Sequence, residues 1–104
     1  MSDVKAFFDG LSAQVDPAKV AGMNSVFQFN LSSATYSVKI ADGAATVTEG
    51  PTEGANIELT LSDEDFLALL KGELNGQQAF LTGKLKIKGD MTLAMKLQSV
   101  FNLG

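Results

Sequence analysis

The hydrophobic residues of this chain follow two periodicities, and the first of them is helical. Near the N-terminus they recur at intervals of three and four residues, at Val4, Phe7, Phe8 and Leu11. This spacing lines them along one face of a helix, for which Ser2 is a suitable N-terminal cap. Asp16 and Pro17 form a second helix-start signal, a capping acid followed by proline. They predict a short helix over residues 18–21 that ends at Gly22.

Between residues 27 and 61 the apolar residues alternate with polar ones, which is the period of a strand. Stretches of this kind predict strands at residues 27–31, 35–40, 45–48 and 57–61. One face of each strand is polar, as in antiparallel sheets that face water on one side. The turn signal Asp42-Gly43 makes the second and third strands antiparallel neighbours. Phe29 and Tyr36 belong to the apolar set that faces inward.

Helical spacing returns after residue 61. Ser62 with Asp65 three residues later is a variant of the capping box, and it predicts a helix that ends at Gly72. The apolar face of this helix consists of Phe66, Leu69 and Leu70. A second, shorter helix is predicted from Gln77 to Leu81, with Gly83 as its end.

Residues 84–88 alternate lysine with Leu85 and Ile87, and they predict a fifth strand. The lysines of this strand face water. There they either protect an edge strand from pairing with other chains or attract anionic lipid head groups. The protective role is the simpler interpretation, because three lysines in an acidic protein make a weak field.

Asp90 caps the final helix, which is predicted to run from Met91 to about Leu103. An ordinary surface helix buries one apolar stripe. This helix has such a stripe and, beside it, a flank that carries Met91 and Met95. Methionine side chains adapt to irregular surfaces. The flank therefore either fills gaps in the core or lies against a second apolar object, such as a ligand.

Composition removes several classes of function. The chain has no cysteine and no histidine, which excludes disulfides and thiolate zinc sites and removes the commonest general base. Twelve acidic residues face eight lysines and no arginine, and this net charge of −4 argues against nucleic-acid binding. The longest apolar run, residues 66–70, is too short to span a membrane. With no signal-peptide pattern at the N-terminus, we expect a cytoplasmic protein of one domain, residues 1–104.

Two groups of residues bear on catalysis. Asp63, Glu64 and Asp65 look like a carboxylate cluster, but acids in the first turn of a helix favour its dipole and face water. Tyr36 is the only phenol, and a small isomerase with a buried carboxylate near Tyr36 is one hypothesis. A lone tyrosine at an inward strand position is more often part of a core. We therefore expect a protein that is not an enzyme and that uses no cofactor and no metal.

Three consecutive motifs resemble those of a known family. They are D-x-D-F-L-A-L-L-x-G over Asp63–Gly72, N-x-Q-x-A-F-x-x-G-K-L-K-I-x-G-D over Asn75–Asp90, and M-x-L-A-M-K-L-Q over Met91–Gln98. Together they resemble the sterol carrier protein 2 (SCP2) domain. The resemblance implies an α+β fold with a five-stranded, mostly antiparallel sheet. About five helices would cover one face, with a hydrophobic tunnel between them and the sheet.

The same resemblance implies non-covalent binding of fatty acid, fatty acyl-CoA, sterol or phospholipid. The chain departs from the family at Gly76, where Asn-Pro is usual, and it lacks the peroxisomal C-terminal tripeptide of many members. Because the chain begins with Met1, we also expect no enzyme domain to precede the module. These departures lead us to expect a free-standing, bacterial-type member. Its function would be to bind lipids and possibly to transfer them inside the cell.

The expected lipid-binding side chains are the apolar residues of the helices and of the sheet's inner face, with two glutamines beside them. They are Phe29, Tyr36, Phe66, Leu69, Leu70, Gln77, Phe80, Leu81, Met91, Met95, Gln98 and Phe101. Either glutamine could donate a hydrogen bond to a lipid head group. We expect a monomer whose partner is the lipid, with at most transient contact with a membrane surface. The alternative is a protein-interaction or dimerisation module that uses the same apolar surface.

Overall fold

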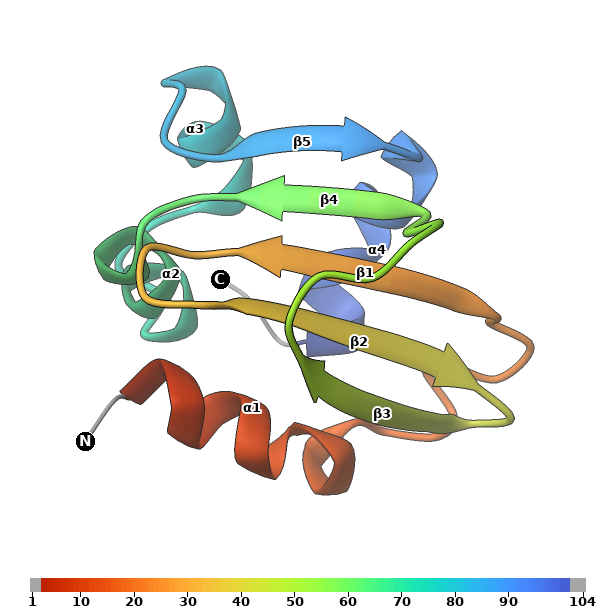
Figure 1. The fold of residues 1–104 in the computed structure, drawn as a ribbon. Helices are drawn as coiled ribbons and strands as arrows, with labels where there is room; N and C mark the ends of the chain where they lie inside the picture. The colour runs from red at the N-terminus through yellow and green to blue at the C-terminus, as the bar shows by residue number, and fades with distance from the viewer. Residues whose placement is uncertain (1–2, 102–104) are drawn as a thin grey trace.

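A computed structural model describes the backbone of residues 3–101 and the side chains of residues 3–11 and 13–96 (Figure 1). Helix α1 spans Asp3–Gln14 and precedes four strands. The remaining elements run from β1 to α4: β1 (Ser25–Asn30), β2 (Thr35–Ala41), β3 (Ala44–Glu49), β4 (Ile57–Thr60), α2 (Asp63–Leu70), α3 (Gly76–Leu81), β5 (Lys86–Gly89) and α4 (Met91–Phe101). Among residues 3–101 no helix is both long enough and apolar enough to cross a membrane.

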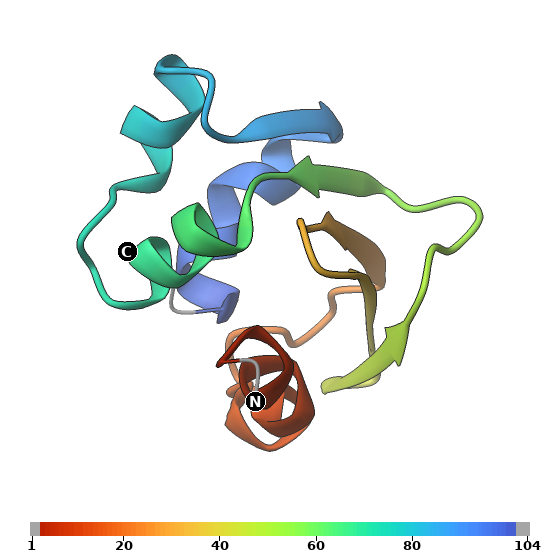
Figure 2. The ribbon, with the colours of Figure 1, turned by 60° about the vertical axis from the view of Figure 1, so that its left-hand side comes forward.

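The sheet has the strand order β3-β2-β1-β4-β5. Strands β1 and β2, β2 and β3, and β4 and β5 are antiparallel, whereas β1 and β4 are parallel. The prediction of a five-stranded, mostly antiparallel sheet is confirmed. All helices of the described chain lie on one side of this sheet (Figure 2).

The prediction of a helix over residues 18–21 is wrong. The described chain therefore has four helices where about five were expected. The segment forms hydrogen-bonded turns, in which Lys19 N donates to Asp16 O over 3.0 Å and Met23 N donates to Val20 O over 3.0 Å. Asp16 does act as a cap, because its Oδ1 accepts a hydrogen bond from Ala18 N. A first helical turn is costly to form, and this segment is too short to repay the cost by extension.

The connection between β3 and β4, residues 50–56, crosses the open face of the sheet, in front of β2 and β1 in Figure 1. We call it the crossing segment. Thr52 N donates to the side-chain oxygen of Gln28 over 3.0 Å, and Ser37 Oγ donates to Gly50 O over 2.8 Å. Gln28 and Ser37 are therefore buried although they point to the polar face. Asn56 Oδ1 accepts from Val26 N over 2.8 Å at the end of the crossing. These bonds place β4 parallel to β1.

The core lies between the sheet and the helices, and aromatic rings form its centre. The ring of Phe8, on α1, stacks on Tyr36 with a centroid distance of 4.2 Å. It also stacks on Phe66 of α2 at 5.5 Å. Phe29 of β1 meets both Phe8 and Phe66 edge to face. Helices α1 and α2 are thus joined to the sheet through one aromatic cluster, made of Phe8, Phe29, Tyr36 and Phe66.

Helix α2 begins as predicted, because Ser62 Oγ accepts the N–H of Asp65 over 3.1 Å. We expect Ser62→Ala to lower the free energy of unfolding by about 1 kcal/mol, the usual effect of losing a helix cap. Urea unfolding measures this change. Ser33 is exposed, so Ser33→Ala should leave the stability nearly unchanged. Equal stability of the two variants would contradict the role of Ser62.

Candidate functional site

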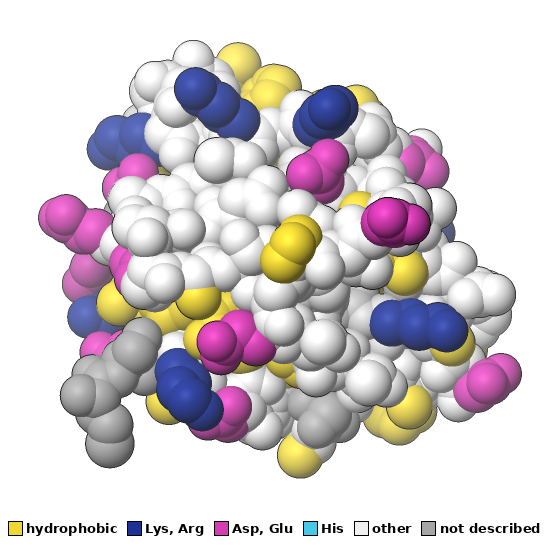
Figure 3. All heavy atoms as spheres, viewed as in Figure 1, with side chains coloured by type: hydrophobic (Ala, Val, Ile, Leu, Met, Phe, Trp, Pro, Cys, Tyr) yellow, Lys and Arg dark blue, Asp and Glu magenta, His cyan; other side chains and the backbone are white. Residues whose placement is uncertain are grey.

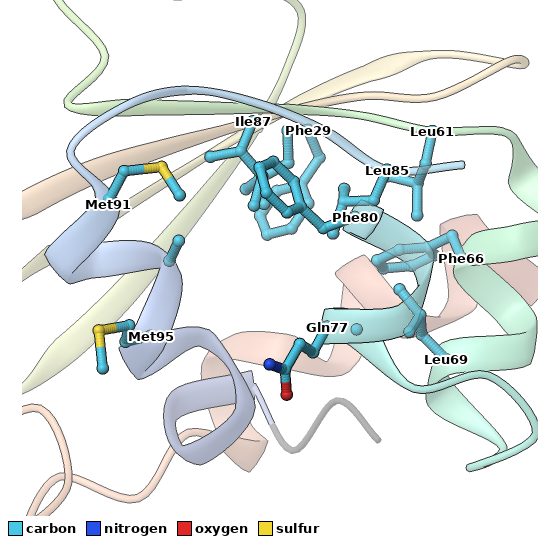
Figure 4. Close-up of a pocket in the computed structure, with 13 residues that line it drawn as sticks. Phe29, Leu61, Phe66, Leu69, Gln77, Phe80, Leu85, Ile87, Met91 and Met95 are labelled. Atoms are coloured by element: carbon cyan, nitrogen blue, oxygen red, sulfur yellow. The ribbon is translucent and has the colours of Figure 1, made fainter. Parts of the chain in front are cut away.

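A pocket of about 450 Å³ lies between the inner face of the sheet and helices α2, α3 and α4 (Figure 4). Its sheet wall comes from β1, from β4 and the residue after it, and from β5 with the residue before it. The side chains of this wall are Phe29, Leu59, Leu61, Leu85 and Ile87. Each belongs to the inward set of its strand or its extension, because alternate side chains of a strand point to the same face.

The helical walls of the pocket complete the lining. Helix α2 contributes Phe66 and Leu69, which are buried on its inner face. Helices α3 and α4 contribute Gly76, Gln77, Phe80, Met91, Ala94 and Met95. Helix α3 is positioned by Asn75, whose Oδ1 accepts the N–H groups of Gln77 and Gln78. On its other side, Ala79 is fully buried, and Ala79 O accepts the N–H groups of Lys84 and Leu85.

The lining is almost entirely apolar. Of its thirteen described residues, Gln77 alone has a polar side chain, and no lining side chain carries a charge. Figure 4 shows the amide of Gln77 pointing away from the rings of Phe29 and Phe80. The pocket can therefore accept an apolar body, with one amide near its edge for a polar group.

The pocket has a buried wall and an exposed rim. Phe29 and Phe66 are each 1% exposed and belong to the aromatic core as well as to the pocket. At the other side Phe80 is 42% exposed, Met91 is 49% exposed and Met95 is 81% exposed. Entry from solvent is thus between α3 and α4. An apolar ligand would cover side chains that now meet water.

Several residues predicted for a lipid site come together in this pocket: Phe29, Phe66, Leu69, Gln77, Phe80, Met91 and Met95. Tyr36, Leu70 and Leu81 do not line it. Leu81 is 74% exposed and Leu70 is half-buried, while Tyr36 lies in the core against α1. The side chains of Gln98 and Phe101 lie outside the described residues.

Leu59, Leu61, Leu85, Ala94 and Ile87 line the pocket but were not predicted as ligand-binding residues. The alternation of apolar residues did place four of them on the inner face of the sheet, and Ala94 is on the final helix. Alternation cannot distinguish an inward residue covered by a helix from one that faces a cavity. The alternation therefore predicted that the four strand residues face inward, but it could not predict that they line a pocket.

Tyr36 has a raised pKa, because burial disfavours the phenolate and the charge of Glu49 adds to the effect. Below pH about 10 the phenol is protonated in both the folded and the unfolded chain. Above that pH the unfolded chain ionises first, so Tyr36 lowers the free energy of unfolding as the pH rises. We expect urea unfolding between about pH 9 and about pH 11 to show a shallower loss of stability in Tyr36→Phe than in the parent. If the free energies of unfolding of the variant and the parent fall in parallel as the pH rises, the raised pKa of Tyr36 is contradicted.

Comparison with known proteins supports the family that the motifs suggested. The sequence model described as the SCP-2 sterol transfer family matches residues 4–102. Sterol carrier protein 2 of Homo sapiens is 46% identical over 67 residues, which cover 64% of this chain and 12% of that protein. The chain thus spans about an eighth of the length of that curated relative.

Solved structures of similar length share the fold. The crystal structure of Sterol Carrier Protein 2 Like 2 from Aedes aegypti has a TM-score of 0.75 and 28% identity, and the match covers 93% of this chain and 94% of that one. The solution structure of palmitated SCP2L2 from Aedes aegypti has a TM-score of 0.70 and 26% identity, with coverage of 97% and 95%. Family match, fold and apolar pocket agree, and this chain belongs to the SCP-2 sterol transfer family.

Proposed function

We propose that this protein binds a lipid non-covalently in the pocket between the sheet and helices α2–α4, and that it carries the lipid without modifying it. The observation that supports the proposal is the uncharged, apolar lining of a pocket of about 450 Å³. That volume lies within the usual range of ligand sites, about 300 to 1,000 Å³. A ligand with an acyl chain or another extended apolar body fits such a lining.

The energetics of apolar burial are sufficient for binding. Each methylene that leaves water contributes roughly 0.8 kcal/mol, so about fourteen of them contribute on the order of 11 kcal/mol. Association and ordering cost roughly 4 kcal/mol or more. The remainder corresponds to dissociation constants on the order of millimolar to micromolar. No ion pair is needed, in keeping with the uncharged lining.

The ligand class is supported by a relative. The solution structure of the Aedes aegypti protein is described as palmitated, which is a statement about that protein. Its fold matches this chain over nearly the full length of both. We therefore propose a fatty acid, or a lipid with a fatty acyl chain, as the ligand, with the amide of Gln77 close to its polar end.

Titration of the delipidated protein with a fluorescent fatty acid tests the proposal. We expect a saturable signal with one site per chain, and displacement of the probe by unlabelled palmitate. With an association cost of roughly 4 kcal/mol, the burial estimate gives an affinity at the micromolar end of its range. Absence of any saturable signal up to about 100 µM probe would overturn the proposal.

A second candidate function is supported by the exposed apolar side chains at the rim of the pocket and next to it. Phe80, Leu81, Met91 and Met95 are large hydrophobic side chains with 42% to 81% of their surface exposed. Exposed apolar patches often mark protein interfaces. Native mass spectrometry separates the two functions. A monomer that retains lipid supports the carrier, whereas a lipid-free dimer supports the interface.

A further inference from the structure

A second pocket, also of about 450 Å³, lies at the other end of the sheet, where α1 packs beside the edge strand β3 (Figure 1). In the described part of the chain it shares no lining residue with the pocket between the sheet and α2–α4. Two carboxylates and a phenol distinguish it from that uncharged pocket. Its lining residues are Phe8, Asp9, Tyr36, Ala45, Thr46, Val47 and Glu49.

The pairing of β2 with β3 explains why a carboxylate and a phenol lie together here. Tyr36 is directly opposite Glu49, and Val38 is directly opposite Val47. Side chains that are paired in this way point to the same face of a sheet, so Glu49 lies on the face that α1 covers. Because β3 is the edge strand and Glu49 ends it, the carboxylate stays exposed, whereas Tyr36 is 5% exposed.

The hydroxyl of Tyr36 makes no hydrogen bond within the described chain. No side-chain polar atom of the described residues is both fully buried and without a partner, so this hydroxyl reaches solvent. It does so in the pocket between α1 and β3, because Tyr36 lines this pocket and not the other. Burial and the charge of Glu49 raise the pKa of Tyr36, which keeps the group a neutral phenol whose oxygen can accept a hydrogen bond.

Helix α1 contributes the second carboxylate. Lys5 Nζ donates to Asp9 Oδ2 over 2.8 Å, which offsets the charge of Asp9. Within the described chain no ion pair offsets the charge of Glu49. In Figure 3, lysine and acidic side chains gather where Figure 1 shows α1 and the end of β3. The pocket thus has a negative opening above an apolar floor of Phe8, Ala45 and Val47.

We propose that this pocket binds a small organic cation, an ammonium group attached to a short apolar body. An ammonium group has three N–H donors and no acceptor. Asp9, Tyr36 and Glu49 offer it oxygen acceptors, and the apolar floor accommodates the body. A metal ion fits less well, because the described residues include no group of three or more carboxylate, thiol or imidazole ligands. The inference does not depend on lipid carriage, and we call this site the amine pocket.

Tyrosine fluorescence tests the amine pocket, because Tyr36 is the only tyrosine and the chain has no tryptophan. The probe is phenethylamine, and its neutral counterpart is 2-phenylethanol, which has a hydroxyl in place of the ammonium. At neutral pH and constant ionic strength, we expect phenethylamine to change the emission saturably, with a dissociation constant on the order of millimolar. 2-Phenylethanol should bind at least roughly tenfold more weakly. Equal binding of the two compounds, or no saturable change up to about 50 mM phenethylamine, would overturn the proposal.

Charge-matched variants locate the contact. Glu49→Gln keeps the shape of the side chain and the Tyr36 fluorophore, and it should bind phenethylamine roughly tenfold more weakly. Glu53→Gln removes the same charge from an exposed position outside the pocket and should bind like the parent. A charge that faces inward on an edge strand can also serve only to keep other chains from pairing with it. Equal binding by the two variants would leave Glu49 with that role alone, and the proposal would be wrong.

Competition with a lipid separates the two pockets. Saturating palmitate should leave the change in Tyr36 emission caused by phenethylamine in place, because the pockets share no described lining residue. If palmitate abolishes that change, phenethylamine occupies the lipid pocket and the amine pocket is contradicted. A protein that binds phenethylamine but not the fluorescent fatty acid supports the amine pocket and contradicts the carrier function alone.

Discussion

Replacing Phe80 by aspartate is expected to weaken binding of a fluorescent fatty acid at least roughly tenfold. In the free protein the side chain at this position is 42% exposed, so a carboxylate there remains hydrated. A bound acyl chain would cover it, and removing a carboxylate from water without a partner costs several kcal/mol. None of the described lining residues offers a positive charge to compensate. Fluorescence titration of delipidated Phe80→Asp against the parent measures the effect.

The matched control for this variant is Leu81→Asp. The two positions are adjacent on α3, but Leu81 is 74% exposed and does not line the pocket. Leu81→Asp should bind the soluble probe like the parent, and circular dichroism should show that both variants fold. If both lose binding equally, α3 acts through its stability and not through its contact with the ligand. Met95→Lys should have a smaller effect, because Met95 is 81% exposed and lysine can extend into water.

Gly89→Ala is expected to lower the free energy of unfolding by about 3 kcal/mol or more, the largest effect on stability that we expect here. Gly89 has a φ of 116°, which side chains rarely adopt. It also lies opposite Ile57 in the β4–β5 ladder. A Cβ on Gly89 would collide with the backbone oxygen of Asn56 and would lie 2.9 Å from the Cα of Ile57. Backbone atoms cannot yield as a flexible side chain can, so β5 would have to move away from β4.

Gly50→Ala separates the two causes of this loss. Gly50 has a φ of 114°, nearly that of Gly89, but a Cβ there would meet nothing within 4 Å. The loss of stability of Gly50→Ala, measured by urea or thermal unfolding, therefore reports the effect of the backbone conformation alone. We expect Gly89→Ala to lose about 2 kcal/mol more than Gly50→Ala. Equal losses would show that the close approach of β5 to β4 does not matter for stability.

The inner face of the sheet could be predicted from the sequence, but the neighbours of each strand could not. Phe29 and Leu59 alternate with polar residues, so both were expected to point inward. Their direct pairing across β1 and β4 is parallel. It depends on the crossing segment, which is held by bonds such as that from Thr52 N to Gln28, 24 residues apart. Long-range bonds of this kind leave no local pattern in the sequence.

In the candidate site, too, the sequence predicts which residues face inward but not what each of them contacts. Phe29 and Tyr36 have the same alternation and are paired across β1 and β2. Phe29 reaches the pocket, whereas Tyr36 is covered by the ring of Phe8. Which of them meets a ligand depends on where α1 lies. In α3, six residues are too few for their periodicity to distinguish Phe80, at the rim, from Leu81, in water.

The strand order also has a consequence for the way in which the protein folds. Strands β1, β2 and β3 are joined by short turns, so their pairing closes small loops. Strand β4 can join β1 only after the crossing segment is in place, which closes a loop of about thirty residues at a larger entropic cost. Strand β5 is at the edge and is paired with β4 alone. We therefore expect the pocket wall made by Leu59 and Ile87 to be assembled late, after the first three strands provide an edge to which β4 and then β5 can be added.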